Sequence, residues 1–445
     1  MWAGALMLLG LTGCGASPAM RAADRGDWAA LRARIAEAHR AGKLSNADAT
    51  DLARRVAKRE IASAPPSQAV ARVHDVSGCA RELDGVLSSR MDVHDDAGAE
   101  AALSRIDAGE LGAGGMRSFT SDASDAWRAV GVRGLTRKKD ADARIAAMLD
   151  GSPRVRRSAM QASAEAASDG DIANVDREVE QLATAARVDP QGIVRSEAVR
   201  ALARIGGEKV VAKLRDLWTN GDDGVREEIA VAWSLPNVYS HGGAAPLRLL
   251  VAAEHGPGAL EAAAAAARRK DVEPPIRASS VALLARTIAK GSRRDRLHAM
   301  AMAPTSEPDI LDAFRQSAKG DDPEMEIAAN ARLLESAPDR EVAIKALELR
   351  ALPAQDGAPV DVQRQRLGGR ARSALAMVGH VRVQAWIERD LQSPDPSMRL
   401  SAAAALGALG RAARGAPLLA DADPEVRTRA ACTLIMASRL KSSIR

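Results

Sequence analysis

Aromatic residues are scarce in this chain of 445 residues, at 2% of the total: six Trp, two Phe and one Tyr. Strands are enriched in β-branched and aromatic residues, whereas Ala, the commonest residue here, is the strongest helix former. The composition therefore disfavours an extended all-β or membrane-barrel fold. Net charge is also small, because 63 Lys and Arg oppose 58 Asp and Glu, which leaves +5. Such a balance does not point to a nucleic-acid partner.

Cysteine is scarce as well, with three in the chain. Cys79 and Cys432 lie far apart in the sequence, and neither has a nearby Cys or His. We therefore expect no metal site and no disulfide, and we interpret Cys432 as a small apolar core residue. Long apolar runs are missing too. The run at residues 2–12 is too short to span a bilayer, which takes about 20 residues, but it has the length of a signal-peptide core.

The residues that follow carry a motif. Leu11-Thr12-Gly13-Cys14 resembles the lipobox of bacterial lipoproteins. The resemblance implies that residues 1–13 are a signal peptide, that Cys14 is lipidated, and that residues 14–23 form a flexible tether. It also implies a place on the periplasmic face of the outer membrane, or otherwise in the periplasm. The run lacks a preceding Lys or Arg, so either the α-amino group supplies the only positive charge or the true start codon lies upstream. The alternative interpretation of the run is an ordinary buried N-terminal helix.

The chain repeats itself, most clearly near its C-terminus. Asp-Pro-Ser-Met-Arg at 395–399 and Asp-Pro-Glu-Val-Arg at 423–427 each precede an Ala- and Leu-rich stretch, and their arginines are 28 positions apart. Asp suits a helix N-cap, Pro suits the first helical position, and the apolar residues recur at helical spacing. Related copies stand at 125–128, 152–156, 189–195, 222–226, 274–277 and 322–326. The pattern predicts repeated pairs of helices.

The repeated motif resembles the bacterial HEAT-repeat family, which includes the repeats of phycobilisome lyases. The resemblance implies an all-α fold, an α-α solenoid of HEAT-like repeats with a less regular helical N-terminal region. It also implies that the motif residues are structural, with each arginine bridging neighbouring repeats through backbone or Asp groups. An arginine stripe that binds phosphate is the other interpretation. The motif residues are Arg156, Asp189, Pro190, Arg195, Arg226, Arg277, Asp395, Pro396, Arg399, Asp423, Pro424 and Arg427.

We expect the repeats to span residues 121–437, with an eight-residue tail at 438–445. The region 24–107 contains expected helices at 27–41, 48–63 and 75–90, and it is either a cap or a set of divergent repeats. Gly and Ser suggest a linker at 108–120, and Pro and Gly suggest a loop at 353–369. The number of repeats between 240 and 380 stays open.

No catalytic constellation emerges from the sequence. The seven His are scattered and none stands at the spacing of a helical metal pair. Deoxyhypusine hydroxylases bind iron through His-Glu dipeptides, and this chain has none. We therefore expect no catalytic residues, no metal and no cofactor. The predicted function is a lipid-anchored periplasmic scaffold whose concave face binds protein partners and no nucleic acid. The alternative is a HEAT-repeat enzyme or accessory lyase-type protein that depends on metal or pigment.

Overall fold

The computed structural model describes residues 17–168, 175–253, 255–353 and 361–440, and Cys14 and residues 1–13 lie outside them. Within these residues every regular element is a helix, and no strand occurs. No described helix is both long and apolar enough to cross a bilayer. The predicted all-α solenoid is confirmed.

The N-terminal region consists of short helices, two of them close to the expected ranges. Its elements are α1 (Pro18–Arg25), α2 (Trp28–Arg40), α3 (Asn46–Ser63), α4 (Pro66–Asp75), the 3₁₀ helix η1 (Ser77–Leu83), α5 (Asp84–Met91) and α6 (Asp96–Asp107). The single helix expected at 75–90 is wrong, because Cys79 adopts a non-helical φ of −118° between α4 and α5.

The repeats follow as alternating helices of two layers. Their first half contains η2 (Ala113–Ser121), α7 (Asp125–Arg133), η3 (Lys138–Asp140), α8 (Ala141–Ala147), α9 (Pro153–Ser168), α10 (Val175–Val188), α11 (Gly192–Ile205), α12 (Glu208–Asn220), α13 (Asp223–Trp233), α14 (Pro236–Val238), the π-helical η4 (Tyr239–Gly243), α15 (Ala244–Ala253) and α16 (Ala259–Arg268). Their second half contains α17 (Pro274–Lys290), α18 (Arg293–Met302), α19 (Pro308–Ser317), α20 (Pro323–Leu333), α21 (Arg340–Ala351), α22 (Val362–Met377), η5 (Val381–Val383), α23 (Gln384–Asp390), α24 (Pro396–Ala408), α25 (Ala412–Gly415), η6 (Ala416–Ala420) and α26 (Pro424–Leu440).

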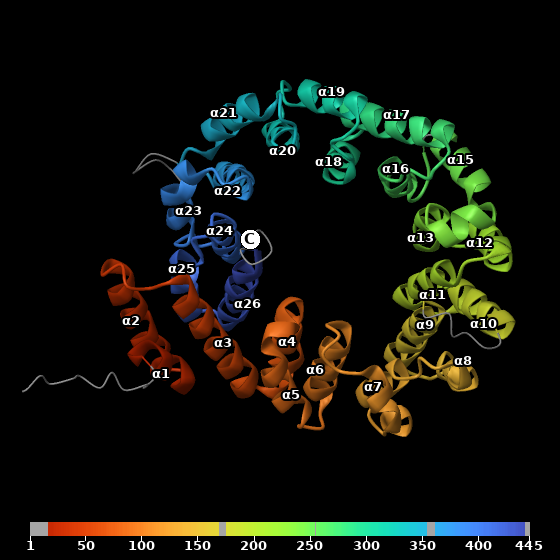
Figure 1. Ribbon diagram of the computed structural model, residues 1–445, viewed down its shortest axis with the longest axis horizontal. Helices are drawn as coiled ribbons and strands as arrows, with labels where there is room; N and C mark the ends of the chain where they lie inside the picture. Colours follow the sequence, from red (N-terminus) through yellow and green to blue (C-terminus); the bar gives the residue numbers. More distant parts are fainter. Residues whose placement is uncertain (1–16, 169–174, 254, 354–360, 441–445) are drawn as a thin grey trace, which may run out of the picture.

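Figure 1 shows that the two layers curve into a closed ring. Going round the ring, the inner layer runs through α9, α11, α13, α16, α18, α20, α22, α24 and α26, and the outer layer through α8, α10, α12, α15, α17, α19, α21, α23 and α25. Helix α26 packs against α24 on one side and against α3 on the other. Helices from the two end regions of the chain are therefore neighbours, and the repeats do not end in an open slab.

The hydrophobic core follows this closure. One buried cluster joins residues between 22 and 101 to residues between 412 and 437, so the two ends of the chain share a core. Small side chains permit the close packing. Gly407 lies inside α24, and a Cβ built there would stand 2.7 Å from the Cβ of Ala437 in α26. Gly407 is therefore a helix contact, whereas Gly410, with φ of 72°, follows the end of α24.

In two segments expected to be irregular, part of the described residues is helical. The linker expected at 108–120 is wrong in its second half, because η2 packs against α7 and places Phe119 4.7 Å from Trp127 between ring centroids. A Cβ on Gly131 of α7 would lie 2.3 Å from the Thr120 nitrogen, so glycine permits this contact. The loop expected at 353–369 is also shorter, because α22 begins at Val362, where Asp361 accepts a hydrogen bond from the Arg364 amide at 3.0 Å.

Candidate functional site

The motif arginines occupy the N-terminal ends of several inner helices and contact the next repeat. Arg156 of α9 donates from Nε and Nη2 to the two carboxylate oxygens of Asp189, at 2.7 and 2.9 Å. Its Nη1 donates to the carbonyls of Asp150 and Gly151, at 2.9 and 3.1 Å. One guanidinium thus closes the turn before its own helix and binds the turn of the following repeat, where Pro190 also lies.

The same contact recurs round the ring. In each copy the arginine pairs with an Asp of the next repeat and donates to the carbonyl six residues before itself. The copies are Arg128 with Asp150, Arg195 with Asp222, and Arg399 with Asp421. We call this series, including Arg156 with Asp189, the arginine ladder.

The pKa values of three ladder carboxylates, Asp150, Asp189 and Asp222, are lowered. Burial by itself raises the pKa of Asp189, but hydrogen bonds from Arg156 and from the Gln191 amide lower it by more, so the net shift is downward. At Asp222 the bond from the Val225 amide is the largest influence and also lowers the pKa. These three pairs of the ladder are therefore charged at neutral pH.

Other motif residues depart from this arrangement. Arg226 donates to the carbonyls of Trp218 and Thr219 in its own repeat and pairs with Asp223 of its own helix. Arg277 pairs with Glu307, which precedes α19. The remaining residues act at helix starts. Asp395 accepts from the Ser397 amide before Pro396 opens α24, and Asp423 accepts from the Glu425 amide before Pro424 opens α26.

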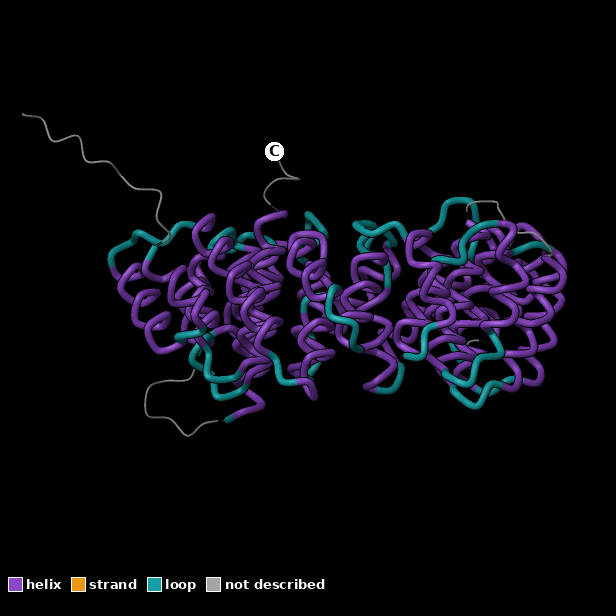
Figure 2. The backbone as a smooth tube through the Cα atoms, turned by 90° about the horizontal axis from the view of Figure 1, so that it is seen from below, coloured by secondary structure: helices purple, strands orange, loops and turns teal. Residues whose placement is uncertain are grey.

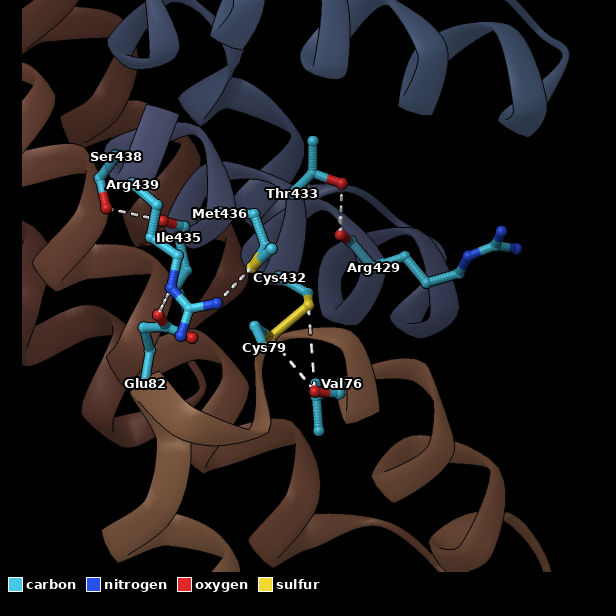
Figure 3. Close-up of a disulfide and its surroundings, with 10 residues drawn as sticks. All are labelled: Val76, Cys79, Glu82, Arg429, Cys432, Thr433, Ile435, Met436, Ser438 and Arg439. Carbon is cyan, nitrogen blue, oxygen red and sulfur yellow. Dashed lines mark hydrogen bonds and ion pairs between the residues drawn. A yellow bond between two sulfur atoms is a disulfide. The ribbon is translucent and has the colours of Figure 1, made fainter. Parts of the chain in front are cut away.

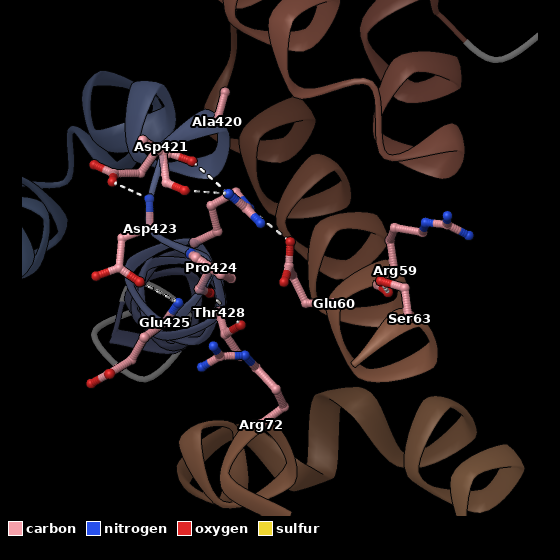
Figure 4. A network of polar contacts seen from close by, with 12 residues as sticks. Arg59, Glu60, Ser63, Arg72, Ala420, Asp421, Asp423, Pro424, Glu425 and Thr428 are labelled. Atoms are coloured by element: carbon pink, nitrogen blue, oxygen red, sulfur yellow. Dashed lines mark hydrogen bonds and ion pairs between the residues drawn. The ribbon is translucent and has the colours of Figure 1, made fainter. Parts of the chain in front are cut away.

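The last ladder arginine closes the ring. Arg427 donates from Nη1 to the Asp421 and Ala422 carbonyls, at 2.7 and 3.1 Å, as its counterparts do. Its Nε donates to Glu60 of α3 at 2.7 Å, where its counterparts bind an Asp (Glu60 is labelled in Figure 4). Its guanidinium also lies 4.4 Å from the centre of the Trp28 ring. We call this junction of α26 with α2, α3 and α4 the seam.

A disulfide crosses the seam. Cys79 and Cys432, 353 positions apart, are bonded to each other (Figure 3). The expectation that these cysteines form no disulfide is therefore wrong. Cys432 is largely buried, as expected, but its role is covalent. Sequence distance gave no sign of the pairing, because the ring brings residues near the two ends of the chain together.

Polar contacts extend the seam along its height. Asn46 at the start of α3 donates to the Gly410 carbonyl at 2.9 Å and accepts from the Ala413 amide at 2.9 Å. Arg32 of α2 donates to the Ala420 carbonyl at 2.7 Å. Nearby, burial and the Glu425 carboxylate raise the pKa of Asp75, more than Arg72 lowers it. The region 24–107 thus completes the ring.

The inner wall of the ring carries paired charges. The outer layer covers one face of each inner helix. The exposed residues on the other face of the inner helices therefore face the central opening. Glu197 of α11 pairs with Arg157 of α9 at 3.3 Å and Glu228 of α13 pairs with Arg200 of α11. Farther along, His298 of α18 lies 2.6 Å from Glu261 of α16. Opposite charges alternate here, so this wall does not present a single-sign field.

The outer wall holds an apolar groove between α21 and α23. Its volume is about 500 Å³, and its lining includes Leu349, Leu352 and Trp386 together with Lys345 and Arg382. Leu349 is 73% exposed. Exposed large hydrophobic side chains are concentrated in this sector of the ring: Val342, Leu349, Leu352, Val362, Met377, Val378 and Val381.

The histidines have partners of other kinds. His94 stacks on Trp127 with ring centroids 4.5 Å apart and lies 3.0 Å from Asp122, and His74 lies 3.7 Å from Glu100. Among the described residues, no group of three His, Cys, Asp or Glu side chains is placed to hold a metal ion.

Sequence reasoning missed two buried ion pairs. Arg144 and Glu178 are both fully buried and pair at 2.8 Å, with a second bond to Glu178 from Ser163. Arg372 pairs with Asp390 at 2.6 Å, where burial raises the pKa of Asp390. Neither pair lies in the Asp-Pro motif, so the sequence offered no pattern for them.

Comparison with known families finds one family model that matches part of the ring. Residues 141–235 and 179–268 match the family model described as HEAT repeats. Comparison with curated protein sequences finds no significant match.

Solved structures offer distant likenesses. An engineered protein is 18% identical, covers 82% of this chain and 96% of its own, and has a TM-score of 0.25. Human deoxyhypusine hydroxylase is 15% identical over 70% of this chain and 98% of its own, with a TM-score of 0.25. Kap121p is 13% identical over 94% of this chain and 48% of its own, with a TM-score of 0.26. Similarities this low transfer no activity or partner to this chain.

Proposed function

We propose that this protein is a lipid-anchored scaffold of the bacterial cell envelope, which binds a protein partner on the inner wall of its ring. The observation that carries the proposal is the Cys79–Cys432 disulfide. Disulfides persist in oxidising compartments such as the periplasm and are rare in the cytosol. The one remaining cysteine of the chain is Cys14, in the lipobox-like motif. Three cysteines with these positions fit an exported lipoprotein, on the periplasmic face of the outer membrane.

The scaffold role is supported by the architecture. Stacked helix pairs give an extended concave surface on which a partner contacts several repeats at once. In this ring that surface is the inner wall, lined by paired charges on successive helices. The metal- or pigment-dependent alternative has no support from the described residues, and a metal analysis and absorption spectrum of the purified chain would test it.

Two measurements test the location. Labelling cells with a radioactive fatty acid should mark the wild-type chain and not Cys14→Ala. Blocking free thiols in intact cells, followed by reduction and attachment of a bulky maleimide, should shift the wild-type chain by two thiols and leave Cys79→Ala/Cys432→Ala unshifted. Equal acyl labelling of wild type and Cys14→Ala rejects the anchor, and free thiols at both positions reject the oxidising compartment.

Photo-crosslinking in cells tests the scaffold. A crosslinking amino acid at Gln161 or Arg204, on the exposed faces of α9 and α11, should capture a protein partner. The matched control places it at Leu249, which is 72% exposed on the outer helix α15. The same partner should be recovered from both inner positions and not from Leu249. Adducts at Leu249 alone would reject the inner wall as the binding surface.

A further inference from the structure

The two faces of the ring differ in what they expose. The arginine ladder joins the N-terminal ends of α9, α11, α24 and α26, so these ends lie level on one face of the ring. The opposite face carries the C-terminal ends of the inner helices and the loops that follow them. Figure 2 shows the ring edge-on, with both ends of the described chain on this second face. We call it the terminal face.

Exposed apolar side chains gather at one loop of the terminal face. Met377 is the last residue of α22, Val378 and Val381 follow it, and the three are 74%, 41% and 58% exposed. Val342, 71% exposed, lies in the first turn of the neighbouring α21. His380 holds this loop against α21 through a contact of 2.6 Å to Glu348. A fixed loop that exposes three aliphatic side chains is costly in water, and such patches mark interaction sites.

Basic side chains lie on the same face in the adjoining repeats. Arg382 follows the apolar loop and its side chain is 79% exposed. Arg411 and Arg414 follow the C-terminal end of α24, and Arg414 reaches Glu388 of α23 at 3.7 Å. Asn46 binds Gly410 and Ala413, so the exposed Lys43, just before α3, lies beside these arginines.

The length of the chain before α1 sets which surface this face meets. Cys14 is three residues from Ser17, where the described chain begins, and an extended chain spans at most about 3.5 Å per residue. A lipid on Cys14 would therefore hold Ser17, at the terminal face, within about 10 Å of the bilayer surface. Apolar side chains that enter the boundary of headgroups and acyl chains, flanked by cations that bind lipid phosphate, are the usual composition of surface-bound elements.

We infer that the terminal face, through Met377, Val378, Val381 and the cations Lys43, Arg382, Arg411 and Arg414, docks on an anionic phospholipid surface. The inference rests on the proposed lipid anchor for its geometry and orients the ring flat on the membrane, with its axis along the membrane normal. The other face, with the arginine ladder, then points away from the bilayer.

The test uses the full chain carrying Cys14→Ala, so that acylation contributes nothing. Cosedimentation with vesicles of phosphatidylethanolamine and phosphatidylglycerol should show binding that salt weakens. Val378→Ser/Val381→Ser should lower the partition coefficient roughly tenfold, since it removes two exposed valines from the contact. Lys43→Ala/Arg382→Ala should lower it by roughly fivefold or more for each charge. Vesicles of phosphatidylcholine alone should bind less of every chain.

Matched controls lie on the opposite face. Val188 and Ile193 are 65% and 56% exposed beside Asp189, and Lys290 and Lys319 are exposed there too. Val188→Ser/Ile193→Ser and Lys290→Ala/Lys319→Ala should bind vesicles as the parent chain does. All these positions are exposed, so unchanged melting temperatures will verify folding.

The outcomes separate this inference from the anchor. Equal vesicle binding by the two double-serine variants overturns the docking face, even if Cys14 is acylated. The docking face is also overturned if Val378→Ser/Val381→Ser changes self-association of the protein and leaves vesicle binding unchanged. Failure of acyl labelling rejects the anchor alone, because the vesicle test uses a chain that cannot be acylated.

Discussion

The junction of α9 with α11 and the seam of α26 with α3 each depend on an arginine at the same position of the repeated motif. The two arginines bind different partners. At the first, Arg156 binds Asp189 in the turn of the next repeat. At the second, Arg427 makes the equivalent two carbonyl bonds but donates to Glu60 in the last turn of α3. The interior junction is one of several similar copies, whereas the seam also has the disulfide and Trp28. The seam therefore has bonds that the interior junction lacks, at the one junction that sequence neighbours do not supply.

The largest effect should come from the disulfide. In Cys79→Ala/Cys432→Ala the seam loses a crosslink between positions 353 apart, worth about 6 kcal/mol by loop-closure entropy. We expect a lower melting temperature and a larger radius of gyration by X-ray scattering as the seam opens. Reduction of the wild type should give the same result, and reduction of the double variant should change nothing. An unchanged radius in both would show that the other seam contacts hold the ring closed.

Removing one carboxylate from each junction compares them directly. Asp189→Ala and Glu60→Ala each leave a buried guanidinium, 9% and 7% exposed, without its ion partner. Each should cost about 3 kcal/mol. Hydrogen exchange should rise at α9 and α11 in the first variant and at α3 and α26 in the second. If Glu60→Ala protects α26 as well as wild type does, the disulfide alone holds the seam.

Acid should affect the two regions in opposite directions. The folded pKa of Asp189 lies below its usual value, so its stabilisation is present above about pH 4 and is lost as pH falls through the folded value. The folded pKa of Asp75 at the seam lies above its usual value, so protonation on acidification favours the folded state.

Replacing each Asp by Asn measures whether its charge stabilises or destabilises the folded ring. At pH 7 Asp189→Asn should destabilise the ring and Asp75→Asn should stabilise it, and both differences should shrink in urea titrations at pH 3. The same sign for both variants at pH 7 would contradict the opposed shifts.

Exposed ion pairs should give the smallest effect, and the same one in both regions. Lys213 pairs with Glu180 on the outer layer at 2.7 Å, and Arg55 pairs with Asp24 near the seam at 2.5 Å. Lys213→Ala and Arg55→Ala should each change the free energy of unfolding by less than about 0.5 kcal/mol. A large loss for Arg55→Ala alone would mean that surface charge also contributes to closure.

The repeats and most helix starts could be read from the sequence because their causes are local. Asp395 and Pro396 begin α24 through a capping bond and a fixed φ, both within a few residues. The arginines of the motif could be assigned to the repeat frame for the same reason. The predictions of a helix at 75–90 and of a linker at 108–120 were wrong, because tertiary contacts decide the conformation of these segments. The contacts are those at Cys79 and those of η2 against α7.

The candidate site was less predictable. Glu60 is an unremarkable position in an amphipathic helix, and Glu178 has no motif, yet each neutralises a buried arginine. Their partners are 367 and 34 positions away in the chain. Such pairs depend on where whole helices arrive, which local pattern does not contain.

The sequence by itself determined that this protein is a stack of paired helices with an arginine at most of the recognised repeat starts, because capping, helical spacing and small side chains act over a few residues. Only the tertiary structure decided that the stack returns on itself and joins Cys79 to Cys432. Closure depends on the small rotation that every repeat adds to the last. That sum over the whole chain is a property of packing and is not written in any one segment.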